Sequence, residues 1–246
     1  MNFKKHIPNI LTLLNLFCGC IAVVFVAQRL FDYAFFFVCL GIFFDFFDGF
    51  LARKFGVAGP LGVQLDSLAD MVTSGVVPGF VMYQMLPSTE MVIENTEITS
   101  CFPMYDNNPM LLLPYLGFVI TLGACYRLAN FNIDTRQSDS FIGLPTPANA
   151  LFIGSLPFLT GEMFNFVHNP WVLIAITFLS AYVMNAEIPL FSLKIKDFSF
   201  QKYKLQIGFL VASVVLLVLF QVTAVPLIIL MYVLLSVVNN TILAKK

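Results

Sequence analysis

Four aspartates interrupt apolar stretches of the chain that are long enough to be membrane helices. Asp45 and Asp48 are three residues apart, and Asp66 and Asp70 are four apart, so on helices each pair lies on one face, about one turn apart. Carboxylates gathered this closely repel one another unless cations balance them, and sites made of oxygen ligands select hard ions. The spacing therefore predicts a site for two divalent metal ions, Mg²⁺ or Mn²⁺, that binds a diphosphate.

Gly49 and Arg53 follow the first aspartate pair on the same predicted helix, four residues apart. A glycine lets a ligand approach the backbone closely, and a guanidinium can hold a phosphate through two parallel hydrogen bonds. Three glycines and a proline in residues 56–62 predict a tight turn into the next helix. We therefore expect the site near a membrane surface, where a water-soluble nucleotide can meet a lipid.

The aspartates alone leave other roles open. Pairing with Arg53 to join helices does not explain them, because one arginine cannot neutralise four acids. Carboxylates inside membranes also form cation or proton pathways. A cation transporter that uses the aspartate cluster therefore remains an alternative on these residues alone.

The composition places these aspartates in a membrane protein. Of 246 residues, 59% are hydrophobic and 11% are charged, far from the roughly 25% charged residues of soluble domains. A membrane helix needs about 20 apolar residues. Eight segments qualify or come close, at about 8–28, 31–52, 64–86, 110–133, 146–167, 170–186, 205–221 and 224–242. We predict one all-α polytopic membrane domain over residues 1–246 with about eight transmembrane helices, or seven if one of the last two segments is re-entrant.

The charged residues between these segments predict the orientation. Threading eight spans alternately places nearly all Lys and Arg residues on one side, with Arg29 as the exception. The longest loop of the other side, at about 87–109, is acidic and has no Lys or Arg. Because cytoplasmic loops are rich in Lys and Arg, we expect both termini and the aspartate site at the cytoplasmic face of the cell (inner) membrane.

The complete pattern spans residues 45–70 and reads Asp45-x-x-Asp48-Gly49-x-x-Ala52-Arg53, eight residues, Gly62-x-x-x-Asp66-x-x-x-Asp70. It resembles the signature of the CDP-alcohol phosphotransferase family at all eight defining positions. That resemblance implies a core of about six helices, commonly dimeric, with two divalent ions in an intramembrane site. It also implies that the first three aspartates bind metal, that the last binds metal and acts as general base, and that Gly49 and Arg53 contact the CDP moiety.

The amino-terminal segment at residues 8–12 also resembles the opening of this family. The resemblance implies that Asn9 and Thr12 help to hold the nucleotide of the CDP-lipid. Both residue types are also common where helices begin and pack. The residues themselves leave these two roles open.

Four further segments, at residues 15–19, 127–132, 141–150 and 188–194, resemble membrane-type phosphatidylserine synthases within the family. This resemblance implies L-serine as the acceptor, with Arg127, Asn130 and Lys194 as acceptor-binding residues. Two positions depart from the expected pattern, since Asn130 replaces an arginine and Asn149 replaces a small residue. From the residues alone, Arg127 either binds a carboxylate or phosphate, or extends its charge to the membrane surface.

The resemblance therefore implies transfer of a phosphatidyl group from CDP-diacylglycerol to serine, with release of CMP. Direct displacement is favoured because no histidine or activated nucleophile appears near the motif. Glycerol 3-phosphate and inositol phosphate are alternative acceptors, although a second phosphate needs more cations than Arg127 and Lys194. Membrane prenyltransferases also use aspartates and a diphosphate donor, but they lack the Gly-x-x-Ala-Arg continuation. Expected partners are membrane lipids and a second copy of the chain, and no nucleic acid.

Overall fold

The computed structural model describes residues 6–86, 109–134, 141–190 and 204–243. Apart from two short strands, β1 (Phe141–Ile142) and β2 (Pro189–Leu190), the regular elements of these residues are helices. The strands pair antiparallel. The predicted all-α class is thus confirmed.

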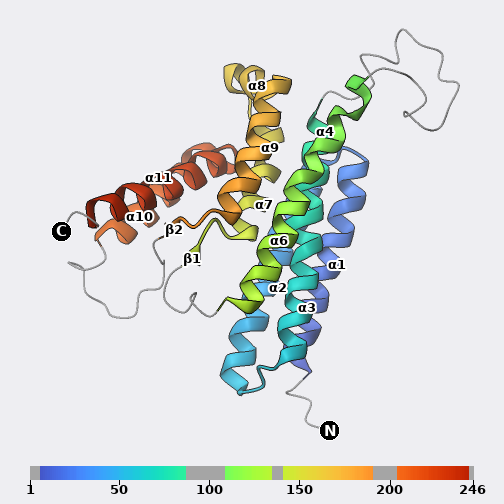
Figure 1. The fold of residues 1–246 in the computed structure, drawn as a ribbon, viewed down its shortest axis with the longest axis vertical. Coiled ribbons are helices and arrows are strands. Elements are labelled where there is room, and N and C mark those ends of the chain that lie inside the picture. The colour runs from blue at the N-terminus through green and yellow to red at the C-terminus, as the bar shows by residue number, and fades with distance from the viewer. Residues whose placement is uncertain (1–5, 87–108, 135–140, 191–203, 244–246) are drawn as a thin grey trace, which may run out of the picture.

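Figure 1 shows α1, α2, α3 with α4, and α6 side by side along the long axis of the molecule. The helices α7 and α9 lie beside this bundle, and α10 and α11 are inclined to it. The α-helices are α1 (Ile7–Ala27), α2 (Phe31–Phe55), α3 (Pro60–Asp70), α4 (Val77–Met85), α6 (Val119–Ile133), α7 (Thr146–Ser155), α8 (Gly161–Val167), α9 (Pro170–Asn185), α10 (Lys204–Phe220) and α11 (Val225–Leu243).

The helices α1 and α2 form a closely packed antiparallel hairpin. Ala22 and Ala34 are buried, and Gly41 of α2 is so close to α1 that a Cβ on it would lie 2.8 Å from the side-chain oxygen of Asn15. Small residues let helix backbones approach closely in membranes. As a result, polar side chains of α1 reach the aspartates of the neighbouring helices.

The predicted third span forms one helical run from Pro60 to Met85, with a π-helix over Met71–Val76 between α3 and α4. This π-helix begins directly after Asp70, and single π-turns are frequent at functional sites. Two hydroxyls connect it to its neighbours: Thr73 donates to the carbonyl of Asn15 at 3.1 Å, and Thr121 donates to the carbonyl of Gly75 at 2.9 Å. The segment that follows Asp70 is therefore attached to both α1 and α6.

Four helical stretches are long and apolar enough to cross a membrane: Ile7–Ala27, Phe31–Phe55, Leu112–Ile133 and Leu205–Asn239. The last combines α10 and α11. The rings of Phe209 and Tyr232 lie 5.6 Å apart, which requires the chain to reverse between them, and Gln221 adopts a left-handed φ of 52° there. The last two predicted segments are therefore two packed helices.

The predicted span 146–167 is not one straight helix. A 3-10 turn (Leu156–Phe158) follows α7, and the chain then bends by 116° into α8. Pro157 lies in that turn, and Gly161 has a φ of 65°, which favours glycine. If the bent pair forms one span, the described residues contain up to five spans by length and composition. These lengths confirm an integral membrane protein, while the total of eight stays a prediction.

Candidate active and metal site

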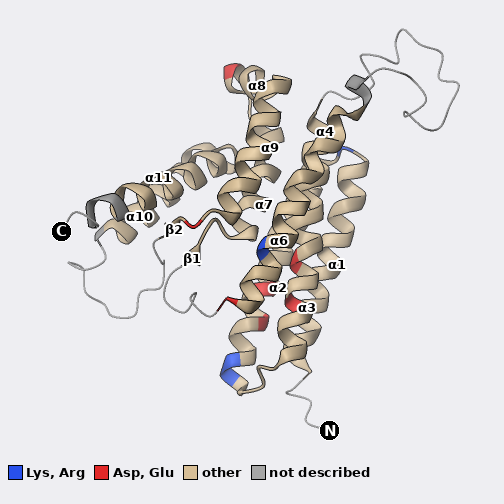
Figure 2. Cartoon of the chain, in the orientation of Figure 1, with Lys and Arg blue, Asp and Glu red and all other residues tan. Residues whose placement is uncertain are grey.

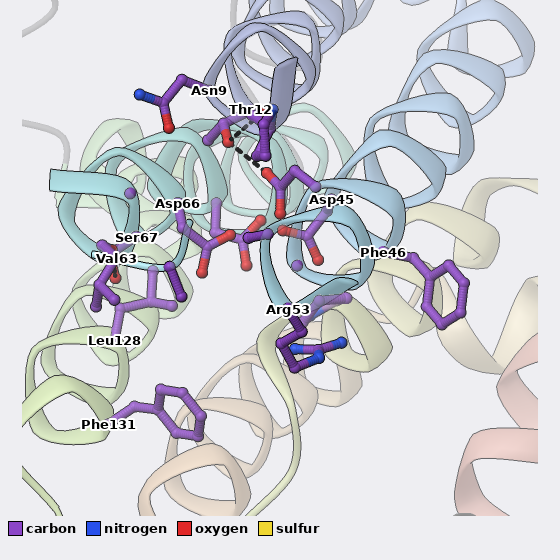
Figure 3. Close-up of a pocket in the computed structure, with 18 of the residues that line it drawn as sticks. Asn9, Thr12, Asp45, Phe46, Arg53, Val63, Asp66, Ser67, Leu128 and Phe131 are labelled. Atoms are coloured by element: carbon purple, nitrogen blue, oxygen red, sulfur yellow. Dashed lines mark hydrogen bonds between the residues drawn. The ribbon is translucent and has the colours of Figure 1, made fainter. Parts of the chain in front are cut away.

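The four aspartates of the predicted motif line one pocket of about 490 Å³. Figure 2 shows a group of acidic residues close together where α2, α3 and α6 run side by side. Ligand oxygens of Asp45, Asp48 and Asp66 all lie within 4.8 Å of one another, and Asp45 and Asp66 point toward each other (Figure 3). Asp70 also lines the pocket and is 8% exposed. The folded chain therefore forms a cluster of three carboxylates with a fourth beside it.

This cluster fits a hard divalent cation. Magnesium and calcium bind oxygen ligands at about 2.0–2.6 Å, so oxygens around one ion lie within a few ångströms of one another. The oxygens of Asp45, Asp48 and Asp66 meet that condition. Asp45 and Asp66 are partly exposed, which leaves room for phosphate or water ligands, and magnesium usually retains such ligands.

The hairpin partner α1 supplies hydrogen-bond donors to two of the acids. The hydroxyl of Thr12 donates to Asp48 (Figure 3), and the amide Nδ2 of Asn15 donates to Oδ1 of Asp70 at 3.1 Å. Thr12 and Asn15 are three residues apart, so both face the site from one side of α1. The contact of Asn15 was missed from the sequence, where its one signal is a polar residue inside an apolar helix.

The end of α2 brings the two aspartate pairs together. A Cβ on Gly49 would lie 3.3 Å from the Arg53 guanidinium, so the missing side chain lets that guanidinium fold back along its own helix. Gly56 ends α2 with a left-handed φ of 64°, and Pro60 begins α3 directly after the extended Gly59. This short turn places α3 against α2, with both acid pairs facing the pocket.

The helix α6 forms the opposite wall of the pocket. Leu128 and Phe131 line it there (Figure 3). Ser67, next to Asp66, exchanges hydrogen bonds of 2.9 and 3.2 Å with Asn132, which connects α3 to α6. The spacing of Ser67 and Asn132 in the sequence gives no sign of this contact. The pocket therefore combines a carboxylate cluster with an apolar wall, as an amphiphilic ligand requires.

Arg127 lines the pocket and is buried, so its charge does not extend to the membrane surface. Its Nη1 donates to the carbonyls of Ile142 at 2.8 Å and Met184 at 3.0 Å. These carbonyls belong to β1 and to α9. Arg127 thus holds together three segments that meet beside the pocket.

The remaining predicted site residues differ in their placement. Asn9, Thr12, Gly49 and Arg53 all line the pocket. Asn130 is exposed and is not among the lining residues, because α6 turns its neighbours Arg127 and Phe131 toward the pocket instead. Lys194 lies outside the described residues. The pocket therefore offers no support for acceptor binding by Asn130.

Fold and site together define a polytopic helical membrane protein with a carboxylate pocket between its first helices. Residues 5–181 match the family model described as CDP-alcohol phosphatidyltransferase. The chain belongs to the CDP-alcohol phosphatidyltransferase family, which confirms the resemblance seen in its sequence.

The chain is also similar to individual curated proteins. The chain is 30% identical over 188 residues to the CDP-diacylglycerol–serine O-phosphatidyltransferase of Bacillus subtilis, covering 75% of this chain and 89% of that protein. It is 30% identical over 147 residues to the enzyme of the same name from Methanocaldococcus jannaschii, covering 60% of this chain and 58% of that protein. The archaetidylserine synthase of Methanothermobacter thermautotrophicus is 28% identical over 187 residues, covering 73% of this chain and 70% of that protein. The match thus spans little more than half of the M. jannaschii relative.

Proposed function

We propose that this protein transfers the phosphatidyl group of CDP-diacylglycerol to L-serine and releases phosphatidylserine and CMP. The observation that carries the proposal is the convergence of the whole family signature in one pocket: four aspartates with Gly49, Ala52, Arg53 and Gly62. The acceptor is supported by relatives that are named for serine transfer. Membrane helices around the pocket suit a lipid donor.

In this proposal the carboxylates of Asp45, Asp48, Asp66 and Asp70 hold two divalent ions, Mg²⁺ or Mn²⁺. The close grouping of the first three supports at least one such site. When bound, the ions would neutralise the diphosphate oxygens and stabilise the charge of the leaving group.

Arg53 and Gly49 are assigned to the CDP side of the donor. The Arg53 guanidinium lies along the open surface left by Gly49, where it can form two hydrogen bonds to a phosphate. Asn9 and Thr12 also line the pocket and are assigned to the nucleotide. The apolar side chains of Leu128 and Phe131 on the opposite wall suit the lipid part of the donor.

Asp70 is assigned as the general base. It takes the proton of the serine hydroxyl while the hydroxyl oxygen attacks the phosphorus atom that carries the diacylglycerol. A phosphorus–oxygen bond forms to serine, the bond to the CMP phosphate oxygen breaks, and CMP leaves with the electron pair. Direct displacement is favoured because no His, Cys or Lys is found among the described residues that line the pocket. Catalysis then depends on orientation and charge neutralisation.

Arg127 is assigned to the acceptor side, because it lines the pocket while its Nη1 donates to two backbone carbonyls. Replacing it with methionine should lower the free energy of unfolding by roughly 1–3 kcal/mol, because two carbonyls lose their donor. It should also raise the KM for serine by about tenfold or more, the effect of losing a charged hydrogen bond. Thermal unfolding in detergent and steady-state kinetics measure both effects.

The matched control for Arg127→Met is Thr177→Val, which removes a buried hydrogen bond of 2.8 Å inside α9, away from the pocket. This control should lower stability without changing the KM for serine. If Arg127→Met destabilises the protein but leaves that KM unchanged, its role is structural alone. The predicted acceptor-binding roles of Asn130 and Lys194 can be tested by the same measurement of the KM for serine.

The topology completes the proposal: one domain over residues 1–246 with eight spans around a six-helix core, both termini and the site cytoplasmic, and a homodimer. The orientation is supported by the distribution of Lys and Arg in the sequence, and the six-helix core and homodimer are what the family resemblance implies. Arg53 and Lys54 also end α2 beside the pocket. In this orientation the site would be accessible to both CDP-lipid and serine.

The experiment that tests the function is release of CMP by purified protein in detergent, with CDP-diacylglycerol and Mg²⁺ or Mn²⁺. Serine, glycerol 3-phosphate, inositol phosphate and no acceptor are compared. Release that depends on serine is the expected result. Release with another acceptor would retain the family but overturn the serine assignment. If folded protein releases no CMP but moves cations across vesicles without CDP-lipid, the aspartate cluster serves transport instead.

A further inference from the structure

Asn15 is a fully buried polar residue in the apolar helix α1, with 0% of its surface exposed. Its Nδ2 donates to Oδ1 of Asp70 at 3.1 Å, whereas its own Oδ1 is buried without a hydrogen-bond partner. A buried unpaired carbonyl oxygen costs free energy, and an apolar side chain of the same shape would avoid that cost. The side-chain amide of Asn15 is therefore explained by the hydrogen bond that it donates to the Asp70 carboxylate.

The surroundings of Asn15 hold its amide in one place. Gly41 of α2 packs so closely that an added Cβ would lie 2.8 Å from the Asn15 side-chain oxygen. On the other side, the carbonyl of Asn15 accepts a hydrogen bond of 3.1 Å from Thr73, in the π-helix that begins after Asp70. The donor and the carboxylate are thus fixed relative to each other through both the side chain and the main chain.

We propose that Asn15 is a positioning residue for the transfer reaction, and this inference rests on the proposed role of Asp70 as base. By donating to Oδ1, Asn15 holds the carboxylate in one orientation at the pocket that Asp70 lines. Thr12, one turn earlier on α1, engages one oxygen of Asp48 in the same way. An uncharged amide does this without adding a cation that would compete with metal ions for the carboxylate.

The first test compares kcat and KM for Asn15→Leu, which keeps the shape but removes the donor, and Asn15→Ser, which is too short to reach Asp70. Misplacing a catalytic group by about 1 Å can cost roughly 100-fold in rate, so both variants should lose kcat by about that factor. The KM values for CDP-diacylglycerol and serine should change by less than about threefold, since the loss falls on the transition state. Thr177→Val controls for the general loss of a buried hydrogen bond and should keep kcat.

The second test needs no activity. Thermal unfolding is measured for Asn15→Leu, Asp70→Leu and the double variant, in a double-mutant cycle. If the amide serves Asp70, the fall in Tm caused by Asn15→Leu should be smaller when Asp70 is already leucine. Additive falls would overturn the proposed contact.

The outcomes separate the two proposals. If the wild-type protein releases CMP with serine and both Asn15 variants keep wild-type kcat, the positioning role is wrong and the proposed function stands. A rise in KM at unchanged kcat would also overturn it, because it assigns Asn15 to substrate binding. If the wild-type protein releases no CMP with any acceptor, the proposed function fails and the positioning role fails with it, even where the cycle shows coupling.

Discussion

Asp70→Asn should abolish serine-dependent release of CMP, with kcat lower by about 10³-fold or more, near the upper range for loss of a general base. Asparagine has the same shape, and its side-chain oxygen can still accept the hydrogen bond that Asn15 donates to Asp70. It cannot accept the proton of the serine hydroxyl, and it is a poor ligand for Mg²⁺. The fold should therefore survive while the chemistry is lost, which CMP release and thermal unfolding of the same sample will show.

The matched control is Asp32→Asn, the same chemical change in the first turn of α2, at the end of the helix opposite the pocket. Asp32 is exposed, so this variant should keep both its activity and its Tm. If Asp70→Asn retains more than about a tenth of wild-type kcat, the assignment of Asp70 as base is wrong. Loss of folding in Asp70→Asn would be visible as a loss of the unfolding transition.

Removal of divalent ions should stop the reaction completely and lower the Tm. Three carboxylate oxygens within 4.8 Å repel one another when no cation lies between them. A bound ion relieves this repulsion, and at 100 times its Kd it adds about 2.7 kcal/mol to the stability of the folded state. Dialysis against EDTA, followed by titration with Mg²⁺ or Mn²⁺, should therefore restore CMP release and raise the Tm together.

Single substitutions in the cluster should change the rise in Tm on adding metal in a known direction. Asp45→Asn and Asp66→Asn each remove one carboxylate of the group, so the rise in Tm on adding metal should shrink strongly in both. Without metal, neither should be less stable than wild type, because each removes a repelling charge. Asp32→Asn should keep the full metal effect. A wild-type Tm that is the same in EDTA and in saturating Mn²⁺ would contradict the assignment of these residues to metal.

The sequence alone was sufficient to predict that the four aspartates gather at one site. Asp45 and Asp48, or Asp66 and Asp70, are one helical turn apart, and local helix geometry decides that each pair faces one way. Gly56, Gly59 and Pro60 predict the short turn between the two pairs for equally local reasons. The family signature and the membrane class follow from the same short-range information, and the family match over residues 5–181 confirms the former.

The contacts around the site depend on helices that are far apart in the chain. Asn15 meets Asp70 across 55 positions, and Ser67 meets Asn132 across 65. Sequence spacing cannot predict such pairs, because they depend on how closely the helices pack and on the rotation that the π-helix introduces after Asp70. The bend at residues 156–161 could not be predicted from the sequence either, because the apolar pattern there predicted a single span.

Arg127 illustrates the difference between what the local sequence predicts and what the tertiary structure adds. Its position in an apolar helix identified it as a costly charge with a special role, since burial of an unpaired cation is unfavourable in any fold. The partners that make the burial tolerable, the carbonyls of Ile142 and Met184, come from β1 and α9 and are brought to Arg127 only by tertiary packing. The sequence by itself therefore determined which residues carry charge into the membrane, and the tertiary structure decided what each of them contacts, because hydrogen bonds require atoms to meet in space.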